Sequence, residues 1–181
     1  MTTQPIIESG MIFGSYPEGH CFHIEKSKTY QSIKNGVKIA ELLLLHPSSE
    51  PKVLIIEAKS SSPRPETQPN FDDFIKEIRD KLTNALTLCV TTCLKRHSTW
   101  EELPTLFQEI DLERINFRLI LVIKGHKEEW LPPLQDALRK ALDSTKKTWK
   151  LSPNFLAVMN HKIAQEEELI SGVCDEDESN S

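Results

Sequence analysis

The sequence predicts a mixed α/β fold with a three-strand antiparallel meander, a long helix, and then a further strand, helix and strand. Three observations support this prediction. Two apolar runs, 37–46 and 52–59, flank a short polar loop, a long amphipathic pattern covers 70–96, and another apolar strand pattern covers 116–124. Two consecutive hairpins followed by a helical crossover give a mixed sheet with helices available to cover it. We therefore expect one α/β domain over residues 1–162.

The stretch 52–59 is predicted to be a central strand. Its aliphatic residues Val53–Ile56 are followed by a segment rich in serine and proline, which is typical of a strand buried on both faces. Side chains alternate along a strand, so Glu57 and Lys59 lie on the same face. A carboxylate and an ammonium group are thus expected side by side at the end of this strand.

The preceding strand brings a second carboxylate close to the first. If His46 and Lys52 close a hairpin around the loop between them, Glu41 faces Glu57 across the strand pair. Two carboxylates at that distance repel each other. The arrangement is tolerable if one carboxylate takes up a proton, if Lys59 compensates the charge, or if a divalent cation lies between them.

This pattern resembles the PD-(D/E)xK nuclease superfamily, whose motif is an acid, a spacer, and then acid-any-lysine. The resemblance implies a restriction-endonuclease-like fold and metal-dependent hydrolysis of phosphodiester bonds in nucleic acid. It implies that Glu41 and Glu57 bind Mg²⁺ or Mn²⁺ and that Lys59 positions or activates the attacking water. These three residues are therefore the predicted catalytic residues. The sequence departs from the family pattern because Glu41 replaces the usual aspartate and no proline precedes it.

The first strand of the meander is predicted over 21–34, because Asn35-Gly36 is a strong signal for a two-residue hairpin turn. This pairing puts two lysines on the sheet face of Glu41, where they either contact a phosphate backbone or neutralise the carboxylates. Two further basic residues lie in the loop 60–69 and on the long helix. The predicted substrate-binding residues are Lys26, Lys28, Arg64 and Lys76.

The long helix over 70–96 is predicted to begin at a capping Asn70 and to bury one apolar stripe. Cys89, Cys93 and His97 have the spacing of metal ligands on one helix face, but we prefer the interpretation that the cysteines pack as small apolar side chains. A short helix is expected from Ser98. A second long helix over 128–149 and a final strand over 154–159 complete the predicted order.

Charge is distributed unevenly along the chain. The net charge is −5, and seven of the 27 acidic residues lie from residue 163 onward, where no basic residue occurs. Residues 1–162 therefore hold 22 basic and 20 acidic side chains, a net charge of +2 that permits a local basic patch. We expect residues 163–181 to form a disordered acidic tail that either mimics nucleic acid or binds a protein partner.

Two classes of function stay open. One is a metal-dependent nuclease, and the other is a non-catalytic domain of nuclease-like fold that binds a protein or nucleic acid. In the second case Glu57 and Lys59 are an ion pair where a buried strand meets water. The chain begins without a secretion signal, and its longest apolar run is Leu42–Leu45, so we expect a cytoplasmic protein without a membrane partner.

Overall fold

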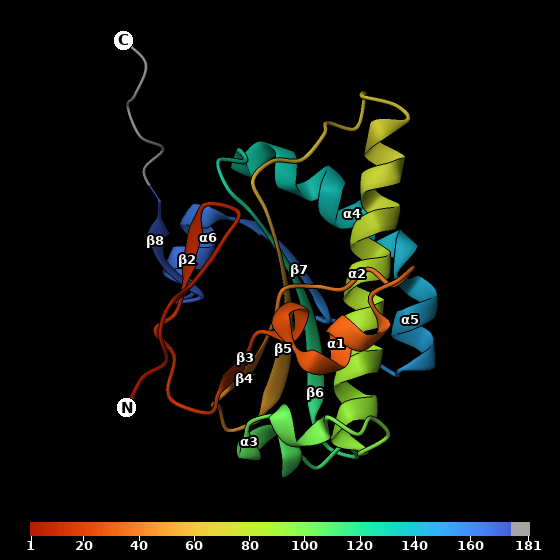
Figure 1. Ribbon diagram of the computed structural model, residues 1–181. Helices are drawn as coiled ribbons and strands as arrows, with labels where there is room; N and C mark the ends of the chain where they lie inside the picture. Colours follow the sequence, from red (N-terminus) through yellow and green to blue (C-terminus); the bar gives the residue numbers. More distant parts are fainter. Residues whose placement is uncertain (175–181) are drawn as a thin grey trace.

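The computed structural model describes residues 1–174 and is organised around a five-stranded sheet with the order β3-β4-β5-β6-β7 (Figure 1). Pairing is antiparallel from β3 to β5 and parallel from β5 to β7. The predicted mixed α/β class, with its meander and helical crossovers, is confirmed. The strands are β3 (Cys21–Phe22), β4 (Leu42–His46), β5 (Lys52–Lys59), β6 (Asn116–Ile123) and β7 (Leu156–Asn160).

The hairpin of β4 and β5 has the predicted register. His46 pairs with Lys52, and Leu42 pairs with Ile56. Strand β5 has a neighbour on each side and buries six of its eight residues, because its aliphatic side chains pack against both faces of the sheet. Continuing this register by one residue places Glu41 beside the last residues of β5.

The predicted strand over 21–34 is wrong beyond its first two residues. After β3 the chain forms η1 (Ile24–Lys26) and α1 (Lys28–Ile33). The side chain of Ser27 accepts a hydrogen bond from the backbone N–H of Tyr30 at the start of α1. This cap stabilises a helix where the hairpin signal favoured a strand. The Asn35-Gly36 turn follows α1 and does not join two paired strands.

Helix α2 (Asn70–Cys93) connects β5 to the parallel strand β6, as predicted. It buries an apolar stripe that includes Ile78 and Leu82. The predicted cap is wrong, because Asn70 is the first helical residue and the residue at the cap position, Pro69, makes no side-chain hydrogen bond. The short helix expected from Ser98 is present as η2 (Trp100–Glu102) and α3 (Thr105–Gln108), and neither has a side-chain cap.

The helix expected over 128–149 is divided into three parts, namely η3 (Glu128–Trp130), α4 (Leu131–Ala141) and α5 (Asp143–Thr148). Two prolines lie in the first turn of α4, where a missing backbone N–H breaks no helical hydrogen bond. Helix α4 packs against α2 and β7. It therefore helps to hold the last parallel strand at the edge of the sheet.

A second, three-stranded sheet was not predicted in full. Its order is β1-β2-β8, with β1 (Ile6–Glu8), β2 (Met11–Phe13) and β8 (Ile170–Val173). Strands β1 and β2 come from the amino terminus, and β8 follows helix α6 (His161–Glu166). The described part of the predicted disordered tail, residues 163–174, therefore contributes to the fold. Residues 175–181 lie outside the described part of the chain.

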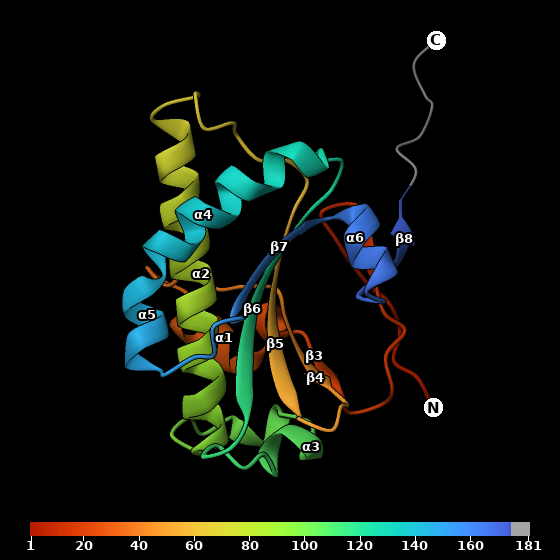
Figure 2. The same ribbon diagram turned by 180° about the vertical axis from the view of Figure 1, so that it is seen from behind.

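Different layers cover the two faces of the five-stranded sheet (Figure 2). One face, which includes Leu43 and Ile55, packs against α2 and α4. The opposite face, which includes Leu54 and Ile56, packs against the small sheet and α6. Glu41, Glu57 and Lys59 belong by alternation to the face under α2. Within residues 1–174, no helix combines the length and apolar character needed to cross a membrane.

Candidate metal centre

Glu41 and Glu57 lie on the same sheet face, as the register predicts. Glu57 is near the end of the central strand β5 and is fully buried, whereas Glu41 immediately precedes β4 and is 7% exposed. The backbone N–H of Glu41 donates to the carbonyl of Ile56 at 3.1 Å, so the two strands hold the acids together. Two buried carboxylates in one place require compensation from other groups.

A lysine of α2 provides most of this compensation. Nζ of Lys81 lies 2.8 Å from Oε1 of Glu57 and 3.7 Å from Oε1 of Glu41. Lys59 lies 3.5 Å from the same Oε1 of Glu57 and makes a shorter contact, 2.7 Å, with Oε1 of Glu77 on α2. Compensation by Lys59 was one of the three alternatives that the sequence left open. Lys59 does contact Glu57, but Lys81 is the ammonium group that lies near both acids. An alternating network of acids and lysines therefore joins β5 to α2.

A second group of ligand-type side chains meets Glu41 from its other side. One ligand atom from each of Glu8, His23, Glu25 and Glu41 lies within 4.8 Å of the other three. These residues come from β1, from the residue after β3, from η1 and from the residue before β4. Carboxylate oxygens together with an imidazole nitrogen suit Mn²⁺ and related divalent cations. Glu41 belongs to both this group and the ion-pair network.

Protonation of Glu41 relieves the repulsion when no cation is present. Burial, a hydrogen bond with Glu25 and the charge of Glu57 raise the pKa of Glu41 to about 9. Burial alone would raise the pKa of Glu25, but its hydrogen bond with Glu41 and the charges of Lys26 and Lys81 lower it overall. A proton on Glu41 is therefore donated to an ionised Glu25.

The partners Glu57 and Lys81 respond differently to burial. Burial raises the pKa of Glu57, although the charges of Lys81 and Lys59 oppose the change. Burial by itself would lower the pKa of Lys81, but attraction to Glu57 and Glu41 raises it. Lys81 is therefore a stable cation held in the space between the two acids.

Several buried acceptors fit a bound cation. Oε2 of Glu41, Oε2 of Glu57 and Nε2 of His23 are buried and receive no hydrogen bond within residues 1–174 when the acids are ionised. Nε2 of His23 lies 3.2 Å from Oε1 of Glu8, but not in hydrogen-bonding geometry. Buried acceptors without donors are unfavourable, and a divalent cation would satisfy them. The donor set around Glu41 thus suits a metal ion.

The predicted substrate-binding residues do not gather on one sheet face. Lys26 is exposed on η1 with Nζ 3.7 Å from Glu25, and Lys28 is exposed at the start of α1. Arg64 pairs with Glu66 and lies 4.8 Å above the ring of Trp130. The prediction that the two lysines share the sheet face of Glu41 is wrong, because this segment is helical.

Lys76 lies closer to the ion-pair network. It lines a cavity of about 600 Å³ on the surface of α2, together with Glu77, the partner of Lys59. The same cavity also contains Lys38 and two aspartates, so its charge is mixed. Contact between Lys76 and a substrate stays a prediction.

Sequence reasoning missed five members of the site. Glu77 and Lys81 are four residues apart on α2 and share a helix face, a signal that could have paired them with the sheet. Glu8, His23 and Glu25 had no usable signal, because tertiary contacts bring their separate segments together. Cys89, Cys93 and His97 form no cation-binding group in residues 1–174. Instead Cys89 is buried in the core, in line with the preferred interpretation.

The arrangement thus offers carboxylates and an imidazole for a cation, with a lysine at the end of the neighbouring strand. The predicted pair of metal ligands, Glu41 and Glu57, is brought together, but Glu57 is paired with lysines and lies outside the four-residue group. Comparison of the chain with protein-family models, with curated proteins and with solved structures gives no match.

Proposed function

We propose that the protein is a metal-dependent phosphodiesterase that acts on nucleic acid. The observation that carries this proposal is the convergence of three ligand-type side chains, Glu8, His23 and Glu25, on Glu41. Glu41 lies beside the Glu57-Ala58-Lys59 end of β5. The order of meander, crossover helix and parallel strand agrees with the fold that the PD-(D/E)xK resemblance implies. Fold-level similarity does not establish activity, so the proposal depends on the chemistry of these side chains.

In this proposal Glu41 and Glu25 hold the cation, with His23 and Glu8 completing the donor set. The cation would supply Lewis acidity toward a phosphodiester oxygen. Glu41 must lose its proton for this role, so binding of the cation competes with binding of a proton. Glu57 either joins the ligands or keeps Lys81 in place.

Lys59 is assigned the role of orienting a water molecule or stabilising the negative charge that develops on the phosphate. Its ammonium group is held by Glu77 and Glu57, and its side chain is 24% exposed. A fixed and charged group that solvent can reach is suited to contact an anionic substrate. Lys81 is less exposed, at 14%, and is assigned to neutralising the buried acids.

Cleavage assays test the proposal directly. Single-stranded and duplex DNA and RNA are incubated with the protein in the presence of Mg²⁺, Mn²⁺ or a chelator. We expect cleavage that requires the metal and falls by about 10²-fold or more in Lys59→Ala. Lys28→Ala is the control, since this exposed lysine lies on α1 and its loss should affect substrate binding more than turnover. Metal-dependent cleavage that persists in Lys59→Ala would refute the assigned role of Lys59.

Calorimetry with Mn²⁺ tests the metal centre separately. We expect heat of binding from the wild-type protein and none from the Glu25→Gln, Glu41→Gln double variant. Glu66→Gln, an exposed acid outside the group, serves as the matched control and should bind like the wild type. Identical heats from the double variant and the wild type would remove the site.

A non-catalytic binding module is the second candidate function. It is favoured by the position of Lys81, whose Nζ lies 2.8 Å from Glu57 and 3.7 Å from Glu41. In that case the network fixes α2 against β5 and has no catalytic role. Absence of cleavage on every substrate, combined with tight binding of one of them, would support this alternative.

A further inference from the structure

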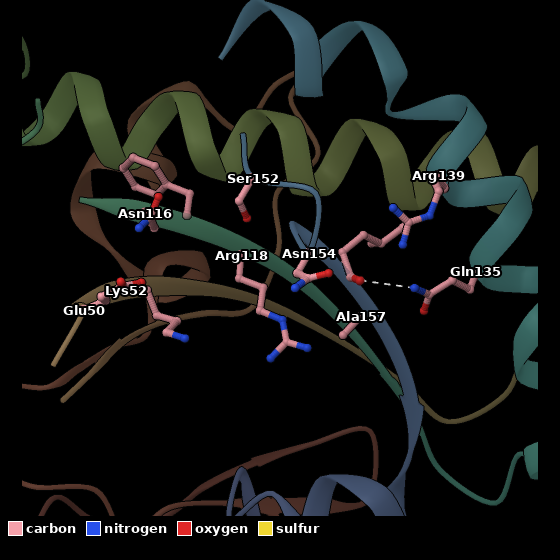
Figure 3. Close-up of a pocket in the computed structure, with 11 residues that line it drawn as sticks. Glu50, Lys52, Asn116, Arg118, Gln135, Arg139, Ser152, Asn154 and Ala157 are labelled. Carbon is pink, nitrogen blue, oxygen red and sulfur yellow. Dashed lines mark hydrogen bonds between the residues drawn. The ribbon is translucent and has the colours of Figure 1, made fainter. Parts of the chain in front are cut away.

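A basic cavity lies at the other end of the five-stranded sheet, where β6 and β7 begin (Figure 3). Its volume is about 550 Å³, within the range of pockets for small molecules. Three of its lining residues are basic, namely Lys52, Arg118 and Arg139, and one, Glu50, is acidic. The cavity therefore has an excess of positive charge, although the chain as a whole is acidic.

Arg118 lacks the partners that a guanidinium group normally has. Its Nε is buried and makes no hydrogen bond to any residue in 1–174. The carboxylate of Glu167 is 3.9 Å from its Nη1, at the outer limit of an ion pair. A buried donor without an acceptor is destabilising by about 1–3 kcal/mol. An anionic ligand in the cavity would provide the missing acceptor.

Arg139 approaches the same cavity from α4, whereas Arg118 extends from β6 (Figure 3). Nη1 of Arg139 donates to the carbonyl of Pro153 at 3.2 Å, and its guanidinium lies 5.7 Å from the ring centre of Phe155. These contacts hold Arg139 in place and leave further donors for a ligand. Arg118 and Lys52 extend from neighbouring strands to the sheet face of Leu54, whereas Arg139 lies on the face that α4 covers (Figure 3). One phosphate can therefore contact Arg118 and Lys52 together through charge-assisted hydrogen bonds.

Polar side chains also line the cavity, and one of them, Gln135, is fixed by two hydrogen bonds. The Gln135 side chain donates to the carbonyl of Leu156 at 3.2 Å and accepts from the N–H of Val158 at 2.8 Å, so it covers the outer edge of β7. Asn116 and Asn154 add amide groups to the wall. These groups suit the hydroxyl groups of a sugar, and the cavity is larger than a free phosphate ion requires.

We propose that this cavity binds a small phosphorylated molecule, with its phosphate group held by Arg118 and Lys52 and its polar remainder facing the amides. Lys52 pairs with Asn116 across β5 and β6, so its side chain lies on the same sheet face as that of Arg118. The site is at the opposite end of the sheet from Glu41 and Lys59, and it does not depend on the proposed cleavage activity.

Binding of inorganic phosphate, ribose 5-phosphate and adenosine monophosphate to the full chain tests the proposal, with NMR chemical shifts to locate the ligand. We expect shifts at residues 116–118 and 154–157, and tighter binding of the two larger probes. Equal affinity for all three probes would mean that the cavity recognises only the phosphate group, and it would overturn the part of the proposal that concerns the polar remainder. Affinity for the best probe should fall at least about tenfold in Arg118→Gln and in Lys52→Gln, since each removes charge-assisted hydrogen bonds.

Arg114→Gln is the matched control, because Arg114 is 88% exposed and lies outside this cavity. It should bind the probes like the wild type. Thermal unfolding without ligand checks that each variant is folded. The proposal fails if no probe binds the wild type, if Arg118→Gln and Lys52→Gln keep full affinity, or if the shifts map to another surface.

Discussion

The two ends of the five-stranded sheet carry an excess of charge of opposite sign. At the carboxyl end of β5, acids exceed the bases between them, and a proton on Glu41 together with Lys81 restores the balance. At the amino ends of β6 and β7, bases exceed acids, and within residues 1–174 Nε of Arg118 is a buried donor without a hydrogen-bond partner. At the first end lysines lie 2.8 and 3.5 Å from Glu57, whereas at the second end the carboxylate of Glu167 is 3.9 Å from Arg118. Buried charge therefore indicates a ligand most directly where the protein leaves it unpaired.

The largest expected effect comes from removing the lysine at the compensated end. Lys81→Met leaves Glu57 buried without its closest cation, 2.8 Å away in the wild type. We expect a loss of about 3–5 kcal/mol in the free energy of unfolding at pH 8, as is typical of a broken buried ion pair. Chemical denaturation measures this loss. Lys76→Met, at an exposed position of the same helix, should change stability little, and an equal loss there would show that the ion pair is not the cause.

A pH effect of Glu41 is the next largest. Its pKa is raised from 4.5 to about 9 in the folded protein, so the folded state keeps a proton that the unfolded state releases above pH 4.5. Its contribution to stability is therefore complete below pH 4.5 and is lost as the pH rises toward 9. Denaturation at several pH values in chelator should show this decline.

Glu41→Gln should remove the part of the pH dependence that belongs to this residue. The variant cannot ionise at this position, so its stability should exceed that of the wild type increasingly toward pH 9. Glu66→Gln controls for the loss of an exposed acid. Parallel curves for the wild type and Glu41→Gln would mean that Glu41 does not hold the proton.

At the uncompensated end, replacing a basic residue with methionine should have the opposite sign. Arg118→Met removes the buried Nε donor and keeps an apolar stem, so we expect stability to be unchanged or to rise by about 1 kcal/mol without ligand. Lys81→Met is expected to be strongly destabilising, so the two methionine variants together test whether the two ends of the sheet differ in how their charges are paired. A loss at Arg118 as large as that at Lys81 would show that its charge is already paired.

The smallest effect concerns the acidic terminus. Removing the whole predicted tail, residues 163–181, would also remove most of α6 and all of β8. The informative variant therefore ends at Cys174. It removes four acids (Asp175, Glu176, Asp177 and Glu178) and changes the formal net charge from −5 to −1. We expect nucleic-acid or phosphate binding to strengthen a few-fold at low salt and the gain to shrink as salt screens exposed charge. Identical affinities at low salt would rule out shielding by these residues.

Local sequence patterns were sufficient for the central part of the fold. The apolar run before Glu57 predicted a buried strand, and the loop between His46 and Lys52 predicted the register that brings Glu41 to its end. The periodic stripe of 70–96 predicted α2. These features depend on the spacing of apolar residues, which alternate in a strand and recur every three or four residues in a helix. Because this spacing is a property of residues close in sequence, it can be recognised without the tertiary structure.

Long-range contacts decided the rest of the site. The spacing of Glu77 and Lys81 shows that they share a helix face, but only the packed structure shows that Lys81 meets both Glu57 and Glu41. Glu8, His23 and Glu25 lie in β1, in the residue after β3 and in η1, and they meet Glu41 only in the packed structure. The basic cavity likewise combines residues from β5, β6, α4 and the segment before β7. The sequence by itself determined the central hairpin, its two acids and its lysine, whereas tertiary structure decided which charges meet, since segments far apart in the chain approach one another only when the core packs.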